Sequence, residues 1–447
     1  MKFQDLLKKK IGFVSLGCDK NRVDLEKIIN HFASAGFQIA NSSTDADIII
    51  VNTCSFILDA RKESINTIIE MAQLKYVGLE KLIVTGCLNN MNYKDLESSL
   101  PEVDAFVKIE DNNKLISIVA ELYNVSIPNK SLECKNTRKI LTTPNHYAYL
   151  KIADGCNNFC TYCTIPYIRG RFKSETMESL LQEAQQLVDG GVREIILVAQ
   201  DVTKYGADIY GKPALVELIR KLSKIKNLDW IRLLYCYPDL ISDELIDEMG
   251  NNPKVCKYID VPLQHVSDNV LKKMNRRTSN KQICEIIEKL RAKMPNMSIR
   301  TTFILGFPGE TEDDFEILCN FVKKYKLDNV GFFKYSREEG TVADKLPNHI
   351  PQKIKNERLK KLSNIQYQIV SEKNNALIGN ETTVVADYIE NGYAVCHGEH
   401  LCPSVDSVIF VPADNIVLGN YYKIKYTKVH KYDMKGEILW IYLIKLQ

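Results

Sequence analysis

The stretch Cys156-Asn-Asn-Phe-Cys160-Thr-Tyr-Cys163 decides the fold, because a strand-like run at 147–153 leads directly into it. Its loop spacing lets three thiolates face one inorganic cluster. A structural zinc site normally closes with a fourth Cys or His, and the closest histidine in the sequence, His146, does not complete this set. Three thiolates on a four-iron cluster instead leave one iron open for a small-molecule ligand. The loop therefore predicts an iron–sulfur enzyme, with zinc or free buried thiols as the alternatives.

The chain around this loop alternates strand-like runs with helical patterns such as 176–188, 213–222 and 281–293. This alternation is typical of parallel sheets covered by helices. Roughly six β/α units predict an open or partial (β/α)6 barrel in a domain at 142–375. The strand candidates are 147–153, 194–199, 230–237, 258–263, 299–305 and 329–335.

The segment before it, predicted as a domain at 1–140, also alternates strands and helices, with apolar runs at 11–16, 48–51, 81–84 and 105–109. Such a rhythm predicts a parallel α/β sheet. Three of these runs end within one to three residues of a cysteine. Ligands bind beyond the carboxyl ends of the strands in such sheets, so these distant cysteines are expected to converge on one site. They are Cys18, Cys54 and Cys87.

The pattern changes again near residue 381, where strand runs follow one another without a long helix. Five short strands predict a small closed β-barrel in a domain at 376–447. A charged helix at 351–373 would connect it to the larger barrel, and a polar stretch at 124–145 reads as a linker between the first two domains. The five runs are 382–388, 393–397, 407–411, 421–429 and 438–446.

Composition sets limits on partners and location. The 447 residues carry 59 basic and 56 acidic side chains, and a net charge of +3 gives no footprint for nucleic acid or an anionic membrane. Thirteen cysteines spread along the chain suit a reducing compartment better than a disulfide framework. No apolar run approaches the roughly eighteen residues that span a bilayer. We expect a cytoplasmic protein without a membrane partner.

The CxxxCxxC loop after the first strand of a β/α barrel resembles the radical S-adenosylmethionine superfamily over residues 147–339. The resemblance implies that the open iron chelates S-adenosylmethionine and that the reduced cluster cleaves it to a 5′-deoxyadenosyl radical. It places Tyr162 near the adenine and the backbone of Gly306-Phe-Pro-Gly309-Glu310 against the adenosine, although such a turn alone is more often only a turn. Because the cofactor performs the difficult chemistry, no catalytic residue is assigned beyond the clusters.

The flanks of the first three cysteines resemble the N-terminal domain of the methylthiotransferases, and the terminal barrel resembles their TRAM domain. These flanks are Ser15-Leu-Gly-Cys18-Asp-Lys-Asn21, Val51-Asn-Thr-Cys54 and Val84-Thr-Gly-Cys87. Taken singly, each cysteine reads as a small buried hydrophobe. The resemblance implies instead that Cys18, Cys54 and Cys87 ligate a second [4Fe–4S] cluster, which handles the inserted sulfur, while a second S-adenosylmethionine provides the methyl group.

The family divides by substrate into enzymes that modify an adenosine of transfer RNA and enzymes that modify the β-carbon of an aspartate in ribosomal protein S twelve of the small subunit. Asn52-Thr-Cys54-Ser-Phe-Ile57, 198–206 and 258–265 resemble the protein-modifying branch. Two residues depart from its pattern, Asp19 where proline is expected and Leu25 where serine is frequent. Neither is a cluster ligand.

Charge supports the same branch. Residues 381–447 contain eight acidic side chains, six lysines and no arginine, whereas an RNA-reading barrel should be basic. We therefore predict an aspartate methylthiotransferase of ribosomal protein S twelve, with no direct sequence-specific contact to nucleic acid. An electron donor such as flavodoxin or ferredoxin is the second expected partner. The alternatives are a transfer-RNA methylthiotransferase and a non-catalytic iron–sulfur scaffold.

Overall fold

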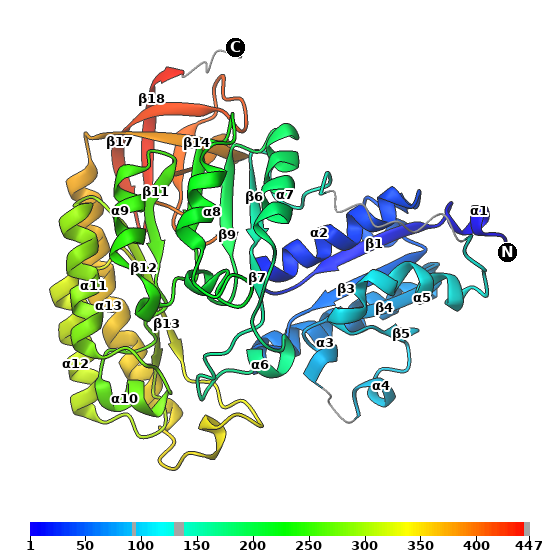
Figure 1. Cartoon of the computed structure of the whole chain (residues 1–447), viewed down its shortest axis with the longest axis horizontal. Coiled ribbons are helices and arrows are strands. Elements are labelled where there is room, and N and C mark those ends of the chain that lie inside the picture. Colours follow the sequence, from blue (N-terminus) through cyan, green and yellow to red (C-terminus); the bar gives the residue numbers. More distant parts are fainter. Residues whose placement is uncertain (92–94, 129–137, 442–447) are drawn as a thin grey trace.

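The computed structural model describes residues 1–91, 95–128 and 138–441 and arranges them in three parts (Figure 1). An N-terminal sheet stands beside an open barrel, and a small terminal barrel covers one end of that open barrel. Within these ranges, no helix is both long and apolar enough to cross a membrane. Residues 129–137, inside the expected linker, and 442–447, at the end of the last expected strand, lie outside the described residues.

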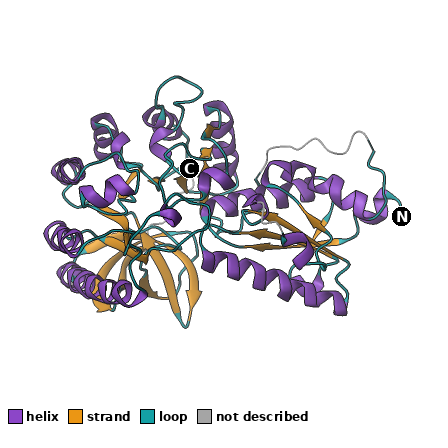
Figure 2. Ribbon diagram, turned by 90° about the horizontal axis from the view of Figure 1, so that it is seen from below, coloured by secondary structure: helices purple, strands orange, loops and turns teal. Residues whose placement is uncertain are grey.

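The N-terminal sheet is parallel throughout, as predicted, with strand order β2-β1-β3-β4-β5. Every residue of β3 is buried, and its side chains alternate between two cores, with Ile48 and Ile50 in one and Ile49 and Val51 in the other. Figure 2 shows helices on both faces of this sheet. Burial on both faces explains the unbroken apolar run in the sequence. The elements are β1 (Lys10–Ser15), α2 (Asp19–Ser34), β2 (Gln38–Ile39), β3 (Ile48–Thr53), α3 (Leu58–Gln73), β4 (Lys81–Gly86), β5 (Ala105–Phe106) and α5 (Leu115–Leu122).

The second sheet has six parallel strands in the order β13-β12-β11-β10-β9-β6, so the partial barrel is confirmed. Each strand lies next to its neighbour in the chain, which is the arrangement that repeated β/α units produce. The strands are β6 (Tyr147–Lys151), β9 (Glu194–Val198), β10 (Trp230–Leu233), β11 (Val255–Asp260), β12 (Ser298–Leu305) and β13 (Asn329–Lys334). The main outer helices are α7 (Met177–Asp189), α8 (Leu215–Leu222), α9 (Asp243–Asn251), α11 (Asn280–Lys293) and α12 (Glu312–Tyr325).

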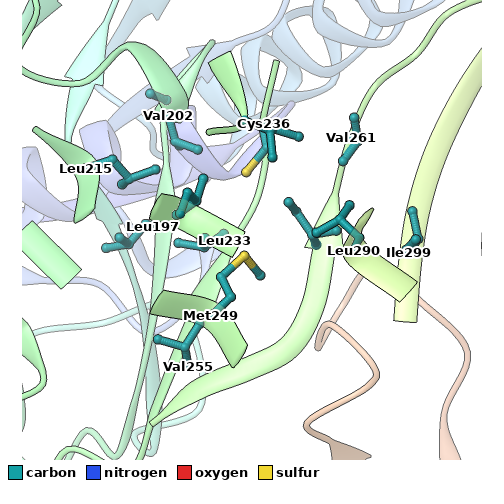
Figure 3. Close-up of a cluster of buried hydrophobic side chains, with 14 of the residues drawn as sticks. Leu197, Val202, Leu215, Leu233, Cys236, Met249, Val255, Val261, Leu290 and Ile299 are labelled. Atoms are coloured by element: carbon teal, nitrogen blue, oxygen red, sulfur yellow. The ribbon is translucent and has the colours of Figure 1, made fainter. Parts of the chain in front are cut away.

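The main core fills the layer between these strands and the outer helices. Figure 3 shows Leu197 and Leu233 from neighbouring strands beside Leu215 of α8 and Met249 of α9. Each of these side chains is almost completely buried. Burial of a side chain of this size contributes roughly 1.5–3 kcal/mol, so this layer supplies much of the stability of the open barrel.

One strand ends earlier than its sequence suggests. The run at 230–237 was expected to be extended, but β10 stops at Leu233. Tyr235 adopts a left-handed conformation with φ 58°, and its backbone N–H donates to the Asp260 carboxylate at 3.0 Å. The carboxylate of Asp260 on the neighbouring strand thus replaces a backbone acceptor of the sheet. The segment after β10 therefore turns out of the sheet.

The terminal part is a closed five-stranded barrel with order β14-β15-β16-β18-β17, as predicted. The last strand begins at Asp433 rather than at 438, because a two-residue turn with Lys431 at φ 58° closes a hairpin directly after His430. The strands are β14 (Glu381–Glu390), β15 (Tyr393–Gly398), β16 (Ile409–Pro412), β17 (Tyr421–His430) and β18 (Asp433–Ile441), and α13 (Gln352–Leu377) precedes them.

A buried charge network joins the terminal barrel to the amino ends of the open-barrel strands. His397 of β15 donates from Nδ1 to Asp387 at 2.9 Å and from Nε2 to Glu194 at 2.8 Å. Glu194 also accepts from Arg232 Nε at 2.6 Å, and His146 lies 2.7 Å from Asp387. Local sequence patterns do not indicate this network, because its members come from five different strands or loops.

The network predicts a pH-dependent stability. Burial alone would lower the pKa of His397, but Glu194 and Asp387 outweigh it and raise the pKa to about 9. Since this value exceeds the unfolded pKa of about 6.5, the stabilisation is complete below pH 6.5 and is lost as pH rises through 9, on the order of 3 kcal/mol. The melting temperature of the chain should therefore fall across this range.

Scanning calorimetry between pH 6 and 10 measures the effect. His397→Gln should flatten the profile, whereas His430→Gln, on the exposed end of β17, should leave it unchanged. An unchanged profile in His397→Gln would show that the network does not titrate in this range.

Candidate active site at two cysteine loops

Three cysteines of the N-terminal sheet meet at one edge. Cys18 follows β1, Cys54 follows β3 and Cys87 follows β4, and these strands are neighbours in the sheet. Cys54 and Cys87 are buried and Cys18 is exposed. Burial raises the pKa of Cys87 to about 11, although the nearby Arg169 guanidinium opposes the shift. The expected convergence of the three cysteines is therefore present in the structure.

The Asn21 side chain ties the three loops together. Its amide nitrogen donates to the carbonyl of Leu16 at 3.0 Å and to that of Thr53 at 2.9 Å. Its amide oxygen lies 3.5 Å from the Sγ atom of Cys87, which acts as the donor. One residue of α2 thus contacts the loop of every cysteine in this set, and the sequence motif did not reveal that role.

The Gly17 backbone approaches Cys54 closely. Its φ is +91°, and a Cβ atom there would lie 2.8 Å from Cys54 Cβ and 3.0 Å from Cys54 Sγ. Both the conformation and the space therefore require glycine. The spacing of the first cysteine loop depends on this position.

The second cysteine set lies in the loop after β6 and the short strand β7 (Ala153–Asp154). The Cys156 sulfur accepts from the backbone N–H of Asn158 at 3.4 Å. The Cys160 sulfur lies 3.9 Å from the Tyr237 hydroxyl and 4.0 Å from a guanidinium nitrogen of Arg276. Burial raises the pKa of Cys156 to about 11. Cys163, whose pKa is raised by the same cause, completes the set.

The spacing of both sets tests which metal group they suit. Among the residues that the structure describes, only His146, Asp387 and His397 bring three ligand atoms within 4.8 Å of one another, so neither cysteine set does. Three thiolates on one tetrahedral zinc would be about 3.8 Å apart, given zinc–sulfur distances near 2.3 Å. A four-iron cluster binds each thiolate through a different iron atom, so the three sulfur atoms lie farther apart than they do on one zinc ion. The donor sets fit a cluster better than zinc.

The residues expected near S-adenosylmethionine also lie together. The Tyr162 ring packs edge-on against Phe307 with centroids 6.4 Å apart. Gly306 has φ +71°, and its N–H donates to Glu310 at 2.5 Å. The carbonyl of Gly309 accepts from Lys273 at 2.8 Å. The 306–310 turn is therefore held next to the second cysteine loop.

Buried ion pairs connect the two cysteine sets. Arg169, only 2% exposed, lies just beyond the second cysteine loop and pairs with Asp24 of α2 at 2.5 Å and with Asp154 at 3.0 Å. It also donates to the Asn21 amide oxygen and lies 3.7 Å from the Cys87 sulfur. One arginine of the barrel thus touches the cysteine site of the other domain.

A groove of about 940 Å³ opens between the two parts. Leu88, which follows Cys87, lines one side, and Thr164, which follows Cys163, lines the other. Arg61, Tyr167 and Glu339 complete much of its wall. The described residues that line the groove include no cysteine, but one chain neighbour of each cysteine set is among them.

Comparison with known families agrees with this division. Residues 150–322 match the Radical SAM superfamily, residues 10–108 match the Uncharacterized protein family UPF0004 and residues 378–439 match the TRAM domain. Relatives that match along nearly their whole length identify the family more narrowly than these domain matches do. The ribosomal protein uS12 methylthiotransferase RimO of Clostridium botulinum is 46% identical over 441 residues, covering 97% of this chain and 99% of that protein. This chain belongs to the RimO family.

Other RimO proteins show similar values. The RimO of Geobacter sulfurreducens is 44% identical over 443 residues, with 97% of this chain and 99% of that protein covered. A solved structure of the radical S-adenosylmethionine methyltransferase TsrM from Kitasatospora setae has a TM-score of 0.57. It covers 86% of this chain and 79% of its own at 12% identity, so it shows a shared fold alone.

Gly17→Ala tests the geometry of the first cysteine loop in this RimO-family chain. It should lower the free energy of unfolding by roughly 1–3 kcal/mol more than Gly78→Ala, because overpacking adds to backbone strain. Gly78 also has a positive φ, +126°, but nothing lies within 4 Å of its added Cβ. Thermal melting of the metal-free proteins provides the comparison, and equal losses would contradict the close approach to Cys54.

Proposed function

We propose that this chain adds a methylthio group to the β-carbon of an aspartate in ribosomal protein uS12 (S twelve). The 46% identity to a RimO protein over 97% of the chain is the observation that supports it most directly. The acidic balance of residues 381–447 favours a basic ribosomal protein over transfer RNA. A cytoplasmic location and a division into 1–140, 142–375 and 376–447 belong to the same proposal.

Membership of the radical S-adenosylmethionine superfamily implies a [4Fe–4S] cluster and S-adenosylmethionine. We assign this cluster to Cys156, Cys160 and Cys163, with Tyr162, Gly306 and Gly309 at the S-adenosylmethionine. We assign a second [4Fe–4S] cluster to Cys18, Cys54 and Cys87. When bound, these groups supply the radical that removes a hydrogen atom, the sulfur that replaces it and the methyl group. A reductant is also needed, and a flavodoxin or ferredoxin would serve.

One buried arginine lies beside each cysteine set. Arg276 lies 4.0 Å from the Cys160 sulfur, and its guanidinium stacks 4.2 Å from the ring centroid of Tyr237. Arg169 lies 3.7 Å from the Cys87 sulfur. Hydrogen bonds and positive charge at the sulfurs raise the reduction potential of a cluster. These side chains would therefore raise the reduction potentials of both clusters.

Mass spectrometry on cells with and without this gene tests the substrate. Loss of a methylthio group from one aspartate peptide of uS12 is the expected result. Transfer-RNA nucleosides are followed in the same samples. A methylthiolated adenosine that disappears while uS12 is unchanged would move the enzyme to the other branch.

Iron content and cofactor cleavage test the two cysteine sets separately. The reconstituted protein should hold about eight iron atoms, and the variants Cys18/Cys54/Cys87→Ala and Cys156/Cys160/Cys163→Ala about four each. Cys156→Ala should abolish reductive cleavage of S-adenosylmethionine, whereas Cys54→Ala should spare some cleavage and stop sulfur insertion. Cys284→Ala, on α11, serves as the control. Full product formation by both single variants would refute the two-cluster assignment.

A further inference from the structure

Lys20 is a buried cation without an anionic partner. It is 6% exposed and lies in the first turn of α2, two residues after Cys18. Its ammonium group sits 3.2 Å from the ring centroid of Tyr235. Across the described parts of the chain, neither an ion pair within 4.0 Å nor a hydrogen bond involves this nitrogen. Because burial of an unpaired charge is costly, such a position suits a site that receives an anion from outside.

The neighbouring carboxylates have other partners. Asp24 pairs with Arg169 and Lys151. Asp260 pairs with Arg300 at 2.9 Å and also accepts from the Tyr235 backbone. The Asp19 carboxylate accepts from the Tyr235 hydroxyl at 3.4 Å.

The other buried cations near the two cysteine sets already have oxygen partners. Arg300 and Arg169 are paired with the carboxylates just described. Arg276 donates to the carbonyl of Pro262 at 2.7 Å. The Nε atom of Arg276 is buried without a hydrogen-bond partner, but among these cations Lys20 is the one whose charged group has no oxygen partner at all.

The position of Lys20 is between the two cysteine sets. The chain itself connects it to Cys18, and its contact with Tyr235 brings it to the carboxyl end of β10. Tyr237, whose hydroxyl lies 3.9 Å from the Cys160 sulfur, is two residues further along. Two residues span at most about 7 Å between Cα atoms. The turn at Tyr235 therefore holds one aromatic ring against Lys20 and places another beside the second cysteine loop.

We propose that Lys20 binds the side-chain carboxylate of the aspartate that this enzyme modifies. The inference rests on the proposed function and adds the residue that selects the substrate. In aspartate the β-carbon is bonded directly to the carboxylate carbon, so a fixed carboxylate also fixes the hydrogen atoms that are to be replaced. Tyr235 orients the ammonium by a cation–π contact. An adenosine base offers no carboxylate for this lysine to bind.

The experiment compares two substrates and needs no enzyme variant for its first arm. Binding of purified, unmodified uS12 to the reconstituted enzyme is measured without reductant. It is then repeated with uS12 in which the target aspartate, located by mass spectrometry, is replaced by asparagine. The wild-type enzyme should bind the aspartate form roughly 10- to 100-fold more tightly, as expected for a charge-assisted hydrogen bond.

The second arm uses Lys20→Met, which keeps an unbranched apolar chain against Tyr235. Its preference for aspartate over asparagine should disappear, while its affinity for the asparagine form should equal that of the wild type. Lys20→Arg should keep part of the preference. Lys8→Met, at a position that is 74% exposed, is the control and should bind as the wild type does.

Two results would overturn the role of Lys20. One is a wild-type enzyme that binds both forms equally, and the other is a Lys20→Met variant that loses the same affinity for both. Both differ from failure of the proposed function, in which the wild-type enzyme, supplied with reductant and S-adenosylmethionine, leaves uS12 without a methylthio group.

Discussion

Arg169 pairs at once with Asp24 of the N-terminal domain and with Asp154 of the open barrel, and it also reaches the Cys87 sulfur. Each of these groups is costly to bury alone, so the contacts are stable only when the two domains are docked in one arrangement. This polar network acts together with apolar packing, because Val23 of α2 is buried in one cluster with Tyr147 and Tyr149 of β6.

Much of the fold followed from the sequence. Unbroken apolar runs such as 48–51 predicted strands that are buried on both faces, and the carboxyl ends of those strands correctly brought Cys18, Cys54 and Cys87 together. The cluster ligands and the contacts to S-adenosylmethionine remain predictions, because they rest on resemblance. What the sequence could not provide were pairings between distant polar residues. The contact between Lys20 and Tyr235 joins residues more than two hundred positions apart, and no periodic pattern encodes it.

The two ends of the open barrel serve different purposes. The cysteine loop lies at the carboxyl ends of the strands, whereas His397 and Glu194 attach the terminal barrel at the amino ends (Figure 1). Local signals had suggested a longer β10, and the turn at Tyr235 shows why the end near the site departs from them. Tyr235 turns out of the sheet and contacts Lys20, and the regular pairing of β10 ends at Leu233. The opposite end keeps regular strands and a fully paired charge network.

The three cysteines of the first set differ in their exposure to solvent. Cys54 and Cys87 are buried beneath the docked domains, and Cys18 is the member of the set that solvent reaches. Arg169 closes over Cys87 from the other domain. A thiol-modifying reagent in solution therefore reaches Cys18 before Cys54 or Cys87.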